Sequence, residues 1–172
     1  MVNSQFGYAG LNARNSGEIS YSSPNLGGFA FSIGHVLKAN NAGVAKNDLN
    51  ITYKNGGFAA GLSYNKLHGK DSNQALGVSY QFSGVRIAGS LQDAVSAGKG
   101  KGFTLGASGT VGPVALLVDW ARDTDADDSD VLLEARYPLS KRTTVYAAHN
   151  RNGKGKTATD VNATLVGIRH NF

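Results

Sequence analysis

The stretch from Leu76 to Leu91, LGVSYQFSGVRIAGSL, contains the pattern on which the fold depends. On either side of Ser83-Gly84 every second residue is apolar or aromatic, apart from Gly89, and the residues between are small or polar. A period of two is that of a β-strand with one apolar face, and a Ser-Gly pair between two such runs indicates a tight turn. The stretch therefore predicts an antiparallel hairpin with one apolar and one polar face.

The same alternation continues in both directions and predicts eleven strands, with Glu18–Ser23 as the first and Thr143–His149 as the tenth. In the tenth strand Val145 and Tyr146 compete for the apolar face. Short connections alternate with longer polar ones. The short ones are 24–28, 55–57, 83–84, 109–113 and 138–142, and the long ones are 39–47, 69–73, 94–100, 124–130 and 150–160. Nearest-neighbour hairpins make an antiparallel meander, and so many strands favour closure into a barrel.

The composition excludes several classes of protein. The 172 residues contain no cysteine, so there is no disulfide framework, thiolate chemistry or Cys-ligated zinc. Hydrophobic residues make up 41% of the chain and charged residues only 17%, while 23 glycines disfavour long helices. The net charge of +5 is an electrostatic bias toward anions and does not indicate a nucleic-acid surface.

Three features favour a membrane barrel with its apolar face outward over a soluble barrel with its apolar face inward. The short turns gather at one end and the long loops at the other. Aromatic residues flank the short turns, at the level where a membrane interface selects them; the alternative is that they only stabilise the hairpins. These aromatics are Tyr21, Phe29, Tyr53, Phe58, Tyr80, Phe82 and Tyr137. Thirdly, charges recur along the polar face, which is costly in a dry core but normal in a water-filled lumen.

Counting alternate positions assigns the charged lumen face. Its cations are Lys38, Lys54, Arg86, Arg136 and Arg169, and its acids are Glu18, Asp48, Asp119 and Glu134. The slight positive balance predicts weak anion preference. Arg86 and Arg136 could also simply pair with neighbouring acids such as Glu134.

The tail TLVGIRHNF, residues 164–172, ends in Phe172 and leads back through His170 and Ile168 in alternate outward positions. It resembles the C-terminal signal that the outer-membrane assembly machinery recognises. Together with SYSSPNLGGFAFSIGH at 20–35 and YPLSKRTTVYAA at 137–148, the tail makes the chain similar to the general diffusion porins of Gram-negative bacteria. The resemblance runs from about Arg14 to Phe172.

The resemblance implies an all-β, antiparallel, up-and-down transmembrane β-barrel. Porins of this family have sixteen strands, so the chain would be the C-terminal portion of such a barrel, with residues 1–17 following an absent constriction loop and residues 18–172 forming the wall. Alternatively, Ser4–Leu11 would add a twelfth strand to a smaller barrel. The implied function is passive diffusion of small hydrophilic solutes and ions, without cofactor or catalysis. The implied partners are outer-membrane lipid, lipopolysaccharide, the barrel assembly machinery and two further copies in a homotrimer.

Two other functions fit the same pattern: a structural or adhesive outer-membrane barrel with ligand-binding loops, and a soluble β-sandwich that binds a ligand. One loop stands out, because Asp123 to Asp130 is dense in carboxylates. It could loosely hold divalent cations that bridge lipopolysaccharide or be a solvated acidic loop, and its spacing lacks the glycine of a helix-loop-helix calcium site. The four histidines lie in no recognisable hydrolase arrangement, so no enzyme is expected.

Overall fold

The computed structural model describes residues 17–40, 43–94, 100–153 and 161–172. These residues form a single sheet of 11 strands and one short 3₁₀ helix, η1 (Lys38–Asn40). The strands are β1 (Glu18–Ser22), β2 (Phe29–Val36), β3 (Lys46–Asn55), β4 (Phe58–Leu67), β5 (Ser72–Phe82), β6 (Val85–Ala94), β7 (Gly100–Val111), β8 (Val114–Asp123), β9 (Asp128–Pro138), β10 (Thr143–Asn152) and β11 (Val161–His170). Within the described ranges no helix is long and apolar enough to cross a bilayer.

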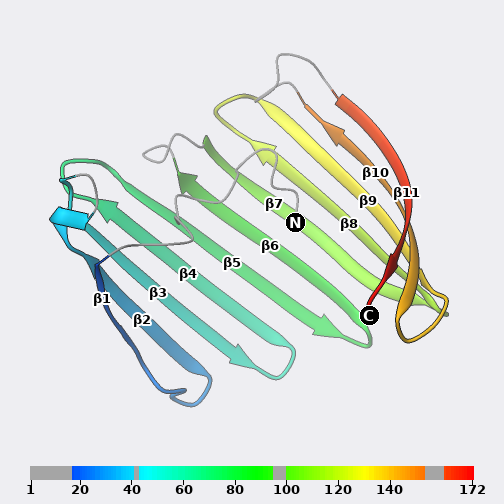
Figure 1. Ribbon diagram of the computed structural model, residues 1–172, viewed down its shortest axis with the longest axis horizontal. Helices are drawn as coiled ribbons and strands as arrows, with labels where there is room; N and C mark the ends of the chain where they lie inside the picture. The colour runs from blue at the N-terminus through cyan, green and yellow to red at the C-terminus, as the bar shows by residue number, and fades with distance from the viewer. Residues whose placement is uncertain (1–16, 41–42, 95–99, 154–160) are drawn as a thin grey trace.

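Each strand pairs antiparallel with its neighbours in the chain, in the order β1 to β11. Figure 1 shows the result as one curved and twisted wall, with the turns that follow β1, β3, β5, β7 and β9 along one edge and the connections that follow the even-numbered strands along the other. The order among the described strands does not close, so β1 and β11 each have one unpaired edge. The predicted meander is confirmed, and its open form is that of an incomplete barrel.

The short turns have the backbone conformations that hairpins need. Ser83 and Gly84 both have positive φ, 44° and 79°, which is the type I′ arrangement whose twist matches that of the flanking strands. Gly112, at φ 58°, precedes Pro113 and begins a turn of the type II′ kind. On the opposite edge the connections 68–71 and 124–127 are no longer than the 139–142 turn, so the two edges differ less than the sequence predicted.

The register places the large apolar side chains on one face of the sheet. Leu76 pairs with Leu62 and Leu91, and across the sheet Leu116, Val118 and Leu133 share that face. We call this the apolar face and the opposite one the polar face. Apolar-face side chains are the more exposed: Val78 is 46% and Leu133 47% exposed.

An apolar core is almost missing from this sheet. Among the described residues the buried hydrophobic side chains are Val36 and Ala121 alone. Small polar side chains such as Ser32, Ser79 and Ser90 are partly shielded, because side chains on the concave side of a curved sheet converge while those on the convex side separate. With one layer and an exposed apolar face, the described fold contradicts the soluble β-sandwich, which needs two sheets packed over a core.

The structure decides the ambiguous tenth strand. Val145 lies on the apolar face between Tyr137 and Ile168, and Tyr146 lies on the polar face opposite Gly167. A Cβ at Gly167 would lie 2.5 Å from the Tyr146 ring, so the ring covers the glycine. The tenth strand also runs on to Asn152, beyond the predicted His149.

Other boundaries also differ from the sequence prediction. Strands β3, β5 and β9 begin inside stretches that were predicted as loops, at Lys46, Ser72 and Asp128. These strand ends carry polar residues on both faces, so the sequence shows no alternation of apolar and polar residues there. The predicted extra strand Ser4–Leu11 lies outside the described residues.

We expect Gly57→Ala to destabilise the β3–β4 turn. The backbone carbonyl of Gly57 accepts the Gln81 N–H at 2.9 Å, and a Cβ at Gly57 would press on the Gln81 carbonyl oxygen of the neighbouring strand. Backbone cannot move aside cheaply, so we expect a loss of about 2 kcal/mol.

Gly77→Ala is the matched control, since a Cβ there would meet its nearest atom at an ordinary 3.9 Å. The measurement is the urea midpoint of unfolding in detergent micelles. Equal midpoints for the two variants would contradict the predicted clash.

Candidate functional site

The polar face of the wall is the candidate functional surface. Its inner rows consist of small side chains joined by polar contacts: Ser63 donates to Asn50 at 2.6 Å, and the hydroxyls of Ser90 and Thr104 lie 2.6 Å apart. Asn73 donates to Asn65 at 2.8 Å in a buried pair. Because these groups satisfy one another across the strands, the face is polar without being crowded.

Four of the five predicted lumen cations lie on the polar face. Lys54 pairs with Ala59, Arg86 with Ser108, Arg136 with Ala115, and Arg169 with Thr144. The exception is Lys38, which lies in η1 beyond the end of β2 and so has no place in the strand alternation. The predicted acids Glu18, Asp48, Asp119 and Glu134 all share the polar face with the four cations.

Glu134 and Arg136 form an ion pair on this face. Both are on β9, and the Arg136 guanidinium donates from Nε to Glu134 Oε1 and from Nη2 to Oε2, the second at 3.0 Å. The two-pronged contact fixes the arginine along its own strand. The sequence left open whether Arg136 pairs with a neighbouring acid, and the structure shows that it pairs with Glu134.

A second ion pair was missed from the sequence. Lys46 Nζ lies 2.9 Å from Asp48 Oδ2, and the two side chains are 5% and 12% exposed. Lys46 had been assigned to a loop, whereas it is the first residue of β3. Its position two residues before Asp48 on the alternating pattern was the signal that would have identified it.

Arg86 lies between two hollows of the polar face. One, of about 370 Å³, lies over β4–β8 and is lined by small residues including Gly61, Gly77 and Gly106. The other, of about 340 Å³, lies nearer the short turns and reaches Gln81, Glu134 and Arg136. Arg86 Nη2 donates to Ser79 Oγ at 3.3 Å. The small neighbours leave open space around its guanidinium.

The predicted interface aromatics lie on the apolar face near the short turns. The rings of Phe29 and Tyr53 are 4.3 Å apart, those of Tyr53 and Phe58 6.1 Å, and those of Tyr80 and Phe82 6.0 Å. Tyr21 contacts Phe31 at 5.9 Å, and Tyr137 stands apart on β9. These contacts stabilise the hairpins, and such a role is compatible with an interface level as well.

At the chain end, Ile168 and His170 lie on the apolar face opposite Val145 and Thr143. Phe172 follows β11, is fully exposed, and its ring packs edge-on against His170 at 5.0 Å. The predicted signal residues thus form one exposed strip. Recognition of this strip by the outer-membrane assembly machinery stays a prediction.

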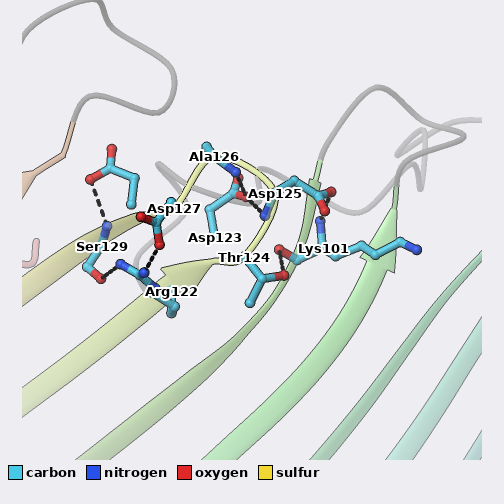
Figure 2. Close-up of polar contacts among 9 residues, drawn as sticks. Lys101, Arg122, Asp123, Thr124, Asp125, Ala126, Asp127 and Ser129 are labelled. Carbon is cyan, nitrogen blue, oxygen red and sulfur yellow. Dashed lines mark hydrogen bonds and ion pairs between the residues drawn. The ribbon is translucent and has the colours of Figure 1, made fainter.

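The carboxylates of the acidic loop are engaged separately (Figure 2). Asp123 accepts the backbone N–H groups of Asp125 at 2.9 Å and Ala126 at 2.8 Å, and Asp125 accepts the N–H of Lys101 at 2.9 Å. Asp127 pairs with Arg122. No three acidic or histidine groups among the described residues are arranged to hold a metal ion. The loop is therefore built as a capped turn between β8 and β9.

Comparison with known proteins agrees with this geometry. The family model described as Gram-negative porin matches residues 2–157. The anion-selective porin from Comamonas acidovorans is 26% identical with a TM-score of 0.64, covering 90% of this chain and 59% of that one. A triple mutant of the Rhodopseudomonas blastica porin is 14% identical, with a TM-score of 0.71. That match covers 90% of this chain and 55% of the mutant porin. The predicted resemblance and fold class are confirmed.

The chain spans less than two thirds of the length of the solved porins that it matches. None of the curated proteins matches it by sequence.

We expect Asp48→Asn to destabilise the fold, because it replaces the carboxylate that lies 2.9 Å from the 5%-exposed Lys46 ammonium with a neutral amide. Breaking a buried pair from one side costs about 3 kcal/mol. The control is Asp93→Asn, which breaks the more exposed pair with Lys101 at 3.3 Å and costs less than about 0.5 kcal/mol. Urea midpoints in detergent micelles measure both, and a larger loss for the control would refute the assignment.

Proposed function

The chain belongs to the Gram-negative porin family, and on this premise we propose that it forms the wall of a water-filled channel for passive diffusion of small hydrophilic solutes and ions. The observation that carries the proposal is the inverted sheet: large apolar side chains occupy the exposed face, and charged groups with small residues occupy the sheltered one. Membership of the family makes the chain an integral outer-membrane protein.

Transfer of the exposed side chains into hydrocarbon stabilises the wall. Side chains such as Leu105, Leu116 and Val166 are 50%, 44% and 80% exposed, and burying apolar area contributes about 25 cal/mol per Å². Because a bilayer offers no hydrogen-bond partners, the backbone groups must pair within the sheet. We therefore propose that the unpaired edges of β1 and β11 meet further strands, which close the wall into a barrel.

Anion preference is the selectivity that we propose. On the polar face Lys54, Arg86 and Arg169 form no ion pair within the described residues, and the charge of Arg136 is compensated by Glu134. The Comamonas porin that shares this fold is described as anion-selective. No chemical reaction is part of the proposed function, since solutes cross by diffusion alone.

The partners follow from the same proposal. The apolar face would contact outer-membrane lipid, and its aromatics would lie at the interface with the headgroups, where amphipathic rings are favoured. The loops would contact lipopolysaccharide, and the strip ending at Phe172 would be recognised by the barrel assembly machinery. We also propose a homotrimer, as the family resemblance implies, and no partnership with nucleic acid.

The orientation of the wall can be tested with the single tryptophan of the sequence, Trp120, which lies on the apolar face and is 38% exposed. In vesicles its fluorescence is expected to be quenched by brominated acyl chains and not by aqueous iodide. The control is Leu117→Trp in a Trp120→Phe background, which moves the indole to the polar face. Iodide quenching of Trp120 itself would rule out the proposed orientation.

Selectivity can be tested by reversal potentials in a KCl gradient across a planar bilayer. Glu134→Gln removes the carboxylate that compensates Arg136, so the chloride-to-potassium permeability ratio is expected to rise roughly twofold. Arg136→Gln is expected to lower it. Lys66→Gln is the control, because it removes one charge from the apolar face. A channel that prefers cations without any substitution would overturn the proposed selectivity.

A further inference from the structure

The charges of the polar face are sorted along the strands. The cations Lys54, Arg86, Arg136 and Arg169 all lie within three residues of the end of their strand at the short-turn edge. We call these four residues the cationic rim. In the same terminal positions of the other described strands there is no Asp or Glu side chain, and the 139–142 turn adds Lys141 and Arg142.

Most acids of the same face lie toward the other end, while Asp119 lies in the middle of β8 and Glu134 lies beside Arg136. Asp48 lies at the start of β3, Asp123 at the end of β8, and Asp128 and Asp130 at the start of β9. Lys46 accompanies Asp48 there, while Asp123 and Asp130 accept backbone N–H groups. The polar face is therefore negative toward the long connections and positive toward the short turns.

The two ends act separately on a dissolved ion. Asp128 and Arg136 lie eight residues apart on β9, which corresponds to about 26 Å at ~3.3 Å per residue. The Debye length is about 8 Å at physiological ionic strength. An ion at one end of the wall is thus largely screened from the charges of the other end.

The rim charges are mostly uncompensated. Arg136 is held by Glu134, whereas Lys54, Arg86 and Arg169 form no ion pair with any residue that the structure describes. Arg86 donates to Ser79 and Arg169 to Asn171, both neutral groups. A cation with only neutral partners keeps its full attraction for a mobile anion.

The hollow of about 340 Å³ beside Arg86 supplies further hydrogen-bonding groups. Its lining includes Gln81 and Ser108, the direct cross-strand neighbours of Arg86, and Thr110. Guanidinium presents two parallel N–H groups to an oxyanion, and neighbouring hydroxyl or amide groups can complete its coordination. This chemistry suits tetrahedral or planar oxyanions better than a halide.

We propose that the cationic rim, with Arg86 at its centre, is a one-sided binding site for small oxyanions at the short-turn mouth of the channel. The proposal rests on the proposed channel function and goes beyond a general anion preference, because it assigns the site to one end. An oxyanion arriving from the short-turn side meets the rim directly. One arriving from the long-loop side first passes the acidic end.

The test uses single channels in a planar bilayer, with inorganic phosphate added to one chamber at a time in KCl. Each channel then serves as its own comparison of the two sides. Since the sequence contains no cysteine, Leu139→Cys in the exposed 139–142 turn marks the short-turn side through block by a membrane-impermeant thiol reagent. We expect the half-blocking phosphate concentration to be about tenfold lower from that side.

Three variants locate the effect. Arg86→Gln is expected to raise the half-blocking concentration from the short-turn side about tenfold and remove the sidedness. Arg86→Lys keeps the charge without the planar fork and is expected to retain sidedness with weaker block. Lys66 lies on the apolar face, at the long-connection end of β4. Lys66→Gln is therefore expected to change neither the half-blocking concentration nor the sidedness.

The outcomes separate the two levels of the proposal. Equal block from both sides, no block, or block that survives Arg86→Gln overturns the rim site while leaving the conducting channel intact. Absence of any conductance overturns the channel function, and the rim site with it. A gel shift on heating in detergent, the same for all variants, ensures that each result refers to a folded barrel.

Discussion

Hydrogen bonding between neighbouring strands is the interaction on which this wall depends. With Val36 and Ala121 as the buried hydrophobic side chains of the described residues, almost no apolar core stabilises the strands. The paired N–H and C=O groups of consecutive strands run without a crossover from β1 to β11. Water competes for such groups but hydrocarbon does not, so the ladder is strongest in a bilayer. The same medium gives the apolar face a favourable environment.

The polar face shows how a charged surface is kept both stable and open. The buried Lys46 is paired with Asp48, and the buried Asp123 and Asp130 accept backbone N–H groups. The cations near the short turns are exposed beside small residues. Glycine makes such close placement possible: Gly106, for example, leaves room for the Asp119 carboxylate and Gly167 for the Tyr146 ring. The sheet thus holds bulky polar groups flat against itself and keeps space beyond them.

The fold was largely predictable from the sequence, because a period of two, repeated through eleven strands, has few physical interpretations. The hairpin around Ser83-Gly84 followed from the alternation of apolar and polar residues alone. Counting alternate positions also assigned Arg86, Glu134 and Arg169 to the polar face. Val145 and Tyr146 could not be separated, since the deciding factor is the empty space over Gly167 on another strand. Lys46 and Asp128 were missed because polar residues at a strand end look like loop. Lys38 could not be assigned to a face by counting, because η1 interrupts the alternation there.

The nearest-neighbour strand order has a kinetic consequence. Each hairpin closes a short loop, so a sheet can grow from either end by adding one strand at a time, and each step costs little chain entropy. β10 and β11, paired continuously from Thr143 with His170 to Asn152 with Val161, make such a unit on their own. Closure is the exception. In a closed barrel the first and last strands must pair although they are distant in sequence, so most of the topological cost of folding is concentrated at that seam.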